Sequence, residues 1–225
     1  MGCWHGAAGT IMDNQHMAAA QHPLFARLYA RCISPSLRRI GADSLRRRAL
    51  DGLAGTVIDV GAGDGANFGF YPDAVEHVIA VEPEPYLRAR AAEAAAAYPV
   101  VDVVDGTAEQ LPVPDASADA VVFTLVLCTV TDPGLALAEA RRVLRPGGEL
   151  RVLEHVLAHE PGPLRSVQRA LDATFWPLLA GGCHCARDTV GAVERAGFAF
   201  ESLDRFTFPA GSRGLESSVV LGRAR

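Results

Sequence analysis

The chain has 225 residues, of which 49% are apolar, and it carries a formal net charge of −5. This length suits one large domain, and the apolar content is enough to bury a sheet. The negative charge has no compensating basic cluster, which argues against a nucleic-acid partner, and no apolar run reaches the roughly 18 residues that span a bilayer.

The cysteines indicate the cellular compartment of the protein, and the basic residues indicate the kind of organism it comes from. Five scattered cysteines are expected of reduced thiols in a cytoplasmic protein. The first residues lack the charged start and long apolar core of a signal peptide. All 21 basic residues are arginine, a composition typical of a GC-rich bacterial genome. We expect a cytoplasmic, bacterial protein that is a monomer or a homodimer.

Two regions precede the first predicted strand. Residues 1–22 show no sustained period and predict a flexible N-terminal arm, so that the domain spans residues 23–225. Between residues 23 and 53, apolar residues at helical spacing predict two helices that are interrupted at Pro35 and act as a lid. The run Arg46 to Arg48 predicts a solvated helix face.

A glycine-rich turn follows the first predicted strand, in the sequence VIDVGAGDGAN from Val57 to Asn67. Glycine is needed where a chain leaves a strand, passes through positive φ and lies against a ligand; Gly61, Gly63 and Gly65 meet that need. Asp59 would repel a phosphate and suits a ligand with positive charge, such as S-adenosylmethionine. The same residues also satisfy the loose pattern of a dinucleotide fold.

Further along, Glu82 ends the second predicted strand, where a carboxylate can accept hydrogen bonds from both ribose hydroxyls of either cofactor. After this strand, the chain has room for one nucleotide-binding half and a short tail. It has no room for a second half and a substrate domain. This favours S-adenosylmethionine over a dinucleotide.

The rest of the chain predicts a single-domain, Rossmann-like α/β fold with a seven-stranded, mostly parallel sheet and an antiparallel edge strand. Ligands of such sheets bind at the carboxyl ends of the strands, which is where the polar residues fall. The predicted strands are residues 56–60, 77–81, 100–104, 119–127, 149–155, 198–207 and 216–223, and the predicted helices are residues 65–70, 84–97, 134–144, 162–180 and 185–196.

Several motifs together resemble the class I S-adenosylmethionine-dependent methyltransferases: DxGxGxGxN, VEP, DGTAEQLPVPDASAD, AVVFTLVLCTV and RRVLRPGGELRVLEHV. Within this class, GANFGFYP, LVLCTV, LRPGG, LEHV and the later W-P, GGC and RDT segments are similar to the methyltransferase-like thiol S-methyltransferases and their bacterial relatives. The quinone-biosynthesis C-methyltransferases share the general motifs and fewer of these details.

The resemblance implies cofactor roles for individual residues. The glycines would line the methionine and ribose, Asp59 would lie near the ammonium group, and Glu82 would hold the ribose hydroxyls. Thr107 stands where many relatives have an aspartate for the adenine amino group, so Glu109 or a backbone carbonyl would accept there. The full predicted cofactor set is Asp59, Gly61, Ala62, Gly63, Gly65, Asn67, Glu82, Pro83, Thr107, Ala108, Glu109, Leu125 and Leu127.

The acceptor decides which catalytic groups are needed. A thiol with a pKa near 8.5 is partly ionised at neutral pH, whereas a phenol or an alcohol needs a general base. Glu154 and His155 follow the fifth predicted strand and are candidates for a base or an orienting group, and Cys128 ends the fourth. The ordinary alternatives are a structural pair at a strand end and a small core cysteine.

The acceptor pocket is predicted to be apolar and to take a small molecule. Thiol methylation is favoured, with oxygen or carbon of a phenol or quinol as the alternative, and a cofactor-binding protein without turnover is a further alternative. The predicted pocket residues are Phe25, Tyr29, Trp176, His184 and Arg187. No metal is expected, because the adjacent side chains of Cys183, His184 and Cys185 point apart and the chain has no second metal-binding motif.

Overall fold

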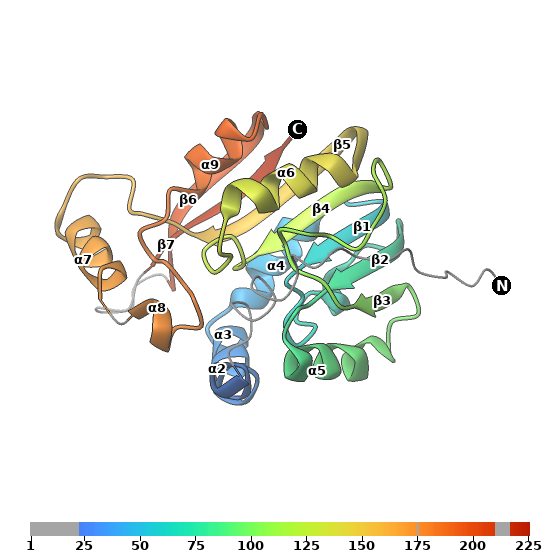
Figure 1. Ribbon diagram of the computed structural model, residues 1–225, viewed down its shortest axis with the longest axis horizontal. Coiled ribbons are helices and arrows are strands. Elements are labelled where there is room, and N and C mark those ends of the chain that lie inside the picture. Colours follow the sequence, from blue (N-terminus) through green and yellow to red (C-terminus); the bar gives the residue numbers. More distant parts are fainter. Residues whose placement is uncertain (1–22, 175, 210–216) are drawn as a thin grey trace, which may run out of the picture.

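The computed structural model describes residues 23–174, 176–209 and 217–225 and shows one sheet with helices on both faces (Figure 1). The predicted arm over residues 1–22 lies outside the described residues. The strands are β1 (Gly55–Val60), β2 (Val75–Val81), β3 (Val101–Val104), β4 (Ala118–Thr124), β5 (Leu144–His155), β6 (Phe200–Phe208) and β7 (Ser217–Ala224).

The helical segments alternate with the strands as the apolar pattern predicts. They are α2 (Pro23–Leu28), the π-helix η1 (Tyr29–Ile33), α3 (Ser34–Arg39), α4 (Ala42–Leu50), the 3-10 helix η2 (Phe68–Phe70), α5 (Pro85–Ala95), α6 (Pro133–Val143), α7 (Pro163–Asp172), α8 (Trp176–Leu179) and α9 (Thr189–Arg195). No helix within the described ranges is both long and apolar enough to cross a bilayer.

The sheet has the strand order β3-β2-β1-β4-β5-β7-β6. Strands β1 to β5 pair in parallel, and β7 runs antiparallel to both β5 and β6. The predicted mostly parallel, seven-stranded sheet with antiparallel pairing at one edge is therefore confirmed, and the reversed strand lies one position in from that edge. The order changes direction between β1 and β4, and at such a switch point the loops diverge and leave a crevice for a ligand.

Two apolar layers hold the helices against the sheet. Helices α6 and α9 lie on one face and α4 and α5 on the other (Figure 1). Leu137 and Val193 are fully buried on the first face, and Leu50 and Ala91 on the second. Because both faces are covered, the central parallel strands bury successive residues: Val57 to Val60 in β1, with Asp59 among them, and Ala120 to Thr124 in β4.

The helices before β1 differ from the prediction in where they break. The chain stays helical from Pro23 to Arg39 and passes through Pro35 without interruption. Pro35 lies in the first turn of α3, where a missing N–H costs little, and the wide turns of η1 precede it. The break comes instead at Gly41, whose φ of 98° only glycine adopts easily.

Other elements are shorter than predicted, always near the carboxyl ends of the strands. The predicted helix 65–70 is only η2, and the predicted strand 119–127 ends at Thr124. The predicted helix 162–180 divides into α7 and α8, and the one predicted from residue 185 begins at Thr189. Irregular backbone therefore collects along one edge of the sheet, where loops commonly carry function.

Candidate active site

The glycine turn after β1 needs glycine at two of its three positions for reasons of space. Gly61 has φ of 66°, its N–H donates to the Val81 carbonyl over 2.8 Å, and an added Cβ would lie 2.6 Å from Val126 Cγ2. A Cβ at Gly65 would lie 2.7 Å from the Phe68 ring. Gly63 also has positive φ, but its nearest neighbour is Tyr29 Cε1 at 3.6 Å.

Asp59 lies under this turn and is 1% exposed. Its carboxylate accepts hydrogen bonds from Asn67 Nδ2, at 3.0 and 3.2 Å to the two oxygens. Burial raises the pKa of Asp59 to about 6, and the hydrogen bonds from Asn67, the neighbouring Tyr71 hydroxyl and the Arg46 charge oppose that rise. The structure thus brings the predicted residues Asp59 and Asn67 together as a buried polar pair.

Arg46 completes the pair, although the sequence reading placed it on a solvated face with Arg47 and Arg48. That reading is wrong for Arg46, which is 5% exposed and donates from Nη1 to Asn67 Oδ1 over 2.8 Å. The missed signal is its spacing, since it shares a helical face with the buried residues Ala42, Leu45, Ala49 and Leu50.

Glu82 faces the other side of the turn, at the end of β2. Its two oxygens accept hydrogen bonds from the Gly63 N–H over 2.8 Å and from the Glu84 N–H over 3.0 Å. Burial raises the pKa of Glu82 to about 7 against the effect of these two bonds. Pro83 follows it, and Ala62 is buried within the turn, its N–H 3.1 Å from the Val81 carbonyl.

The residues after β3 take structural positions. Thr107 and Ala108 are buried beyond the end of that strand. Glu109 is hydrogen-bonded to the loop before α6: its Oε1 accepts from the N–H groups of Thr131 and Asp132, at 3.0 and 3.3 Å. A direct role for Glu109 toward an adenine group stays a prediction.

The turn after β4 is organised by a buried carboxylate. Leu125 has φ of 60°, an unusual value for a leucine, and the N–H groups of the next three residues point at Glu154. Glu154 accepts from Val126, Leu127 and Cys128 at 2.8, 2.9 and 3.3 Å. Its side chain is fully buried, and burial raises its pKa to about 7.

The segment between α8 and α9 docks on this turn. Arg187 Nη1 donates to the carbonyls of Leu127 and Val130, at 2.8 and 2.7 Å, and the His184 N–H donates to the Cys128 carbonyl over 2.8 Å. The predicted pocket residue Arg187 therefore supports the turn. Its contact with a substrate stays a prediction.

This docking places Cys183 beside two of the predicted catalytic residues. One ligand-type atom each of Cys128, His155 and Cys183 lies within 4.8 Å of the others. The hydrogen bond with Cys128 and the neighbouring His155 lower the pKa of Cys183 to about 5, and the same thiol pair raises the pKa of Cys128. The sequence analysis weighed Cys183 only with its neighbours His184 and Cys185, and did not place it with Cys128 and His155, which lie at the ends of two strands.

The predicted pocket residues are brought together in part. Phe25 packs on Gly181, where an added Cβ would clash with its ring, and Phe25 and Tyr29 have ring centroids 6.1 Å apart. The His184 ring turns instead toward Asp172, at 3.5 Å, and Trp176 is 38% exposed on α8. A small cavity beside α3 and α4 is lined by Arg46, Leu125 and His155, among others.

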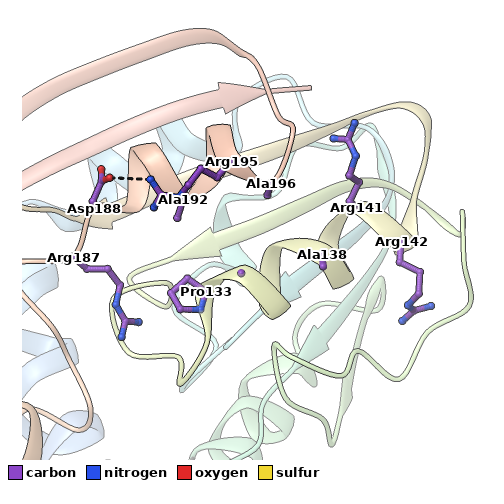
Figure 2. Close-up of a pocket in the computed structure, with 10 residues that line it drawn as sticks. Pro133, Ala138, Arg141, Arg142, Arg187, Asp188, Ala192, Arg195 and Ala196 are labelled. Atoms are coloured by element: carbon purple, nitrogen blue, oxygen red, sulfur yellow. Dashed lines mark hydrogen bonds and ion pairs between the residues drawn. The ribbon is translucent and has the colours of Figure 1, made fainter.

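A larger cavity of about 630 Å³ opens elsewhere, between α6 and α9 (Figure 2). Its arginines already have protein partners. Arg195 bonds Asp188 at 3.3 Å, Arg141 donates to the Gly197 carbonyl, and Arg142 bonds Asp115. Since this groove does not include the glycine turn or the thiols, the candidate site is the carboxyl edge around β1, β2, β4 and β5.

The geometry distinguishes between the two cofactors that the sequence left open. A dinucleotide fold places its pyrophosphate at the N-terminus of the helix that follows the glycine turn. Here residues 61–67 form turns and only the three-residue η2 follows. The buried carboxylate of Asp59 also lies under the turn, which suits a cationic adenosyl donor and opposes a pyrophosphate.

Comparisons with known proteins agree with this geometry. A methyltransferase-domain family model matches residues 58–152. Thiol S-methyltransferase TMT1B of Rattus norvegicus is 37% identical over 153 residues, covering 66% of this chain and 62% of that protein. Thiol S-methyltransferase TMT1A of Homo sapiens is 33% identical over 206 residues, covering 89% of this chain and 76% of that protein.

Solved structures show the same fold. An S-adenosylmethionine-dependent methyltransferase from Mesorhizobium loti superposes with a TM-score of 0.62 at 21% identity, covering 82% of this chain and 99% of that one. The glycine turn and the strand order of this structure agree with the family that these matches indicate. The chain therefore belongs to the class I S-adenosylmethionine-dependent methyltransferases.

Proposed function

We propose that this protein transfers the methyl group of S-adenosylmethionine to the sulfur of a small, apolar thiol. The observation that carries the choice of thiol is the extent of similarity to the thiol S-methyltransferase TMT1A of Homo sapiens, over 89% of this chain. The methyl group is already activated in the cofactor's sulfonium. The protein therefore has to supply alignment and a site with little water.

The residues around the glycine turn fit this cofactor. Asp59 and Glu82 offer two buried carboxylates, and Gly61 and Gly65 let the turn pack against Val126 and Phe68, where a Cβ would clash. In our proposal Glu82 accepts from the ribose hydroxyls, Asp59 and Asn67 hold the amino-acid end, and Tyr29 covers Gly63. Pro83, Thr107 and Ala108 would border the adenine.

Glu154 is proposed as a positioning residue. Its carboxylate is occupied by three backbone N–H groups and is fully buried, so it holds the turn that carries Leu125 and Cys128. This turn faces the crevice where donor and acceptor would meet. The pocket would be completed by Phe25, Tyr29 and the segment that follows α8.

A screen of acceptors tests the proposal. Purified protein with S-adenosylmethionine would be given small aliphatic and aromatic thiols, the matching phenols and a quinol, and S-adenosylhomocysteine release would be measured. We expect turnover with thiols that exceeds turnover with the matching phenols at least about tenfold, because a thiol is partly ionised at neutral pH.

Turnover of phenols or quinols alone would assign the enzyme to oxygen or carbon methylation. Cofactor binding is measured separately, by calorimetry with S-adenosylhomocysteine and with NAD. We expect heat only from the first. Binding of NAD without binding of S-adenosylhomocysteine would refute the assignment of the glycine turn, and binding without any turnover would indicate a non-catalytic protein.

A further inference from the structure

Two thiols and an imidazole meet at the carboxyl edge from three separate parts of the chain. Cys128 lies in the turn after β4, His155 ends β5, and Cys183 lies between α8 and α9. One ligand-type atom from each lies within 4.8 Å of the others. In a tetrahedral zinc site the ligand atoms are roughly 3.5–3.8 Å apart, so small side-chain rotations are enough to close on one ion.

The backbone holds these three side chains in place without an ion. The Cys128 N–H donates to buried Glu154, and its carbonyl accepts the His184 N–H, which fixes the residue next to Cys183. His155 belongs to β5 and is paired in register with Val219 of β7. A metal site on such a frame is preorganised, and Glu154 supplies the second layer that supports its ligands.

Cys185, the other cysteine between α8 and α9, points in a different direction from Cys183. Cys185 points to α7, where its Sγ donates to Asp172 Oδ1 over 3.2 Å and its N–H donates to the same oxygen over 2.8 Å. Asp172 also lies 3.5 Å from the His184 ring. The two residues that follow Cys183 are thus directed toward α7, while Cys183 itself joins Cys128 and His155.

We propose that Cys128, Cys183 and His155 bind one soft divalent cation, with zinc as the best fit, and leave its fourth position open. Two thiolates and one imidazole are ligands that zinc prefers, and three protein ligands with one open position are typical of catalytic zinc sites. This reverses our expectation of no metal. Cys183 does point away from His184 and Cys185, which both face Asp172, but it finds its partners in the turn after β4 and at the end of β5.

The site also suggests how a thiol is activated, an inference that rests on the proposed function. A thiol that takes the open position loses its proton to solvent and binds as a thiolate. Its sulfur then forms the new bond to the methyl carbon while the sulfonium–methyl bond breaks. The products are a methyl thioether and S-adenosylhomocysteine, and the metal keeps its charge. His155 then acts as a ligand and not as a free base.

Cobalt binding to the reduced, chelator-treated protein tests the site with the metal alone. We expect one equivalent of Co²⁺, with the intense visible bands of tetrahedral cobalt and a thiolate-to-cobalt charge-transfer band, and displacement by Zn²⁺. Cys183→Ser should weaken binding more than about 100-fold and reduce the charge-transfer band. His155→Asn should weaken binding similarly and keep that band.

Cys185→Ser is the matched control, since it removes a neighbouring thiol that points to Asp172, and we expect it to bind cobalt like the wild type. Thermal unfolding and S-adenosylhomocysteine binding show that each variant is folded. Absence of tetrahedral bands in the reduced wild type would overturn the proposal. Equal losses in Cys183→Ser and Cys185→Ser would overturn it as well.

The two proposals fail separately. If cobalt binds as expected and no thiol is methylated, the metal site stands and the thiol function falls. If thiols are methylated by protein that takes up no cobalt, the function stands and the metal site falls.

Discussion

The two halves of the candidate site are built in different ways. The centre of the cofactor half is nearly continuous in sequence: Asp59, the glycines and Asn67 lie within one strand and its turn, and Glu82 and Arg46 join them from elsewhere. The acceptor half is assembled from the turn after β4, the end of β5 and the segment before α9. A local motif therefore identifies the first half, whereas the second exists only in the folded chain.

The largest expected effect is in the acceptor half, at Glu154. Glu154→Ala leaves the N–H groups of Val126, Leu127 and Cys128 buried without an acceptor, and each such group costs about 1–3 kcal/mol. We expect the free energy of unfolding in urea to fall by about 3 kcal/mol or more. A loss below about 1 kcal/mol would show that the turn after β4 keeps its structure without the Glu154 carboxylate.

The next effect, in the cofactor half, comes from an added methyl group at Gly61. Gly61→Ala combines positive φ with a contact of 2.6 Å to Val126, and we expect a loss of about 2–4 kcal/mol in the same measurement. Gly63→Ala is the matched control: its φ is 61°, but its nearest neighbour is 3.6 Å away, so about 1 kcal/mol is expected. Equal losses would rule out a steric role for Gly61.

A pH effect of about 3 kcal/mol is expected at Glu82, because each unit of pKa change on folding corresponds to about 1.4 kcal/mol. Its pKa rises from 4.5 to about 7 on folding because burial disfavours the carboxylate. The folded state then holds more protons than the unfolded state between these values, so the stability of the unliganded protein is highest below pH 4.5 and falls as the pH rises to about 7.

Asp59, whose pKa rises from 3.8 to about 6, adds to the same trend at lower pH. Urea unfolding between pH 4.5 and 7.5 measures the slope. Glu82→Gln should reduce the slope between pH 5 and 7, while the parts due to Asp59 and to Glu154, whose pKa burial also raises to about 7, remain. An unchanged slope in this variant would contradict the assignment to Glu82.

The smallest effect concerns the link between α4 and the glycine turn. Arg46→Met removes the donor to Asn67 and leaves its buried oxygen without that partner, so we expect a loss of about 1–2 kcal/mol. Arg39→Met, at an exposed position of α3, is the control and should change stability by less than about 0.5 kcal/mol. Similar changes in both variants would show that the Arg46 contact contributes nothing.

The predictions made from the sequence succeeded mainly in the cofactor half of the site and failed mainly in the acceptor half. The glycine turn, Asp59 and Glu82 were predicted together and lie together, because strand ends of a parallel sheet converge on one edge. Arg46 was misplaced, since a run of arginines looks solvated until helical spacing shows that one of them faces the sheet. Cys183 was weighed only with His184 and Cys185, and its grouping with Cys128 and His155 was missed, because its neighbours in sequence are not its neighbours in space.

The amino-acid sequence alone determined the α/β class, the parallel direction of the first five strands and the cofactor turn. These depend on local periods of apolar residues and on glycine's access to positive φ, which a single segment displays. Only the tertiary structure decided that Glu154 serves the backbone of a distant turn and that Cys128, His155 and Cys183 meet. Such contacts depend on how loops pack beyond the strand ends, and no local pattern records that packing.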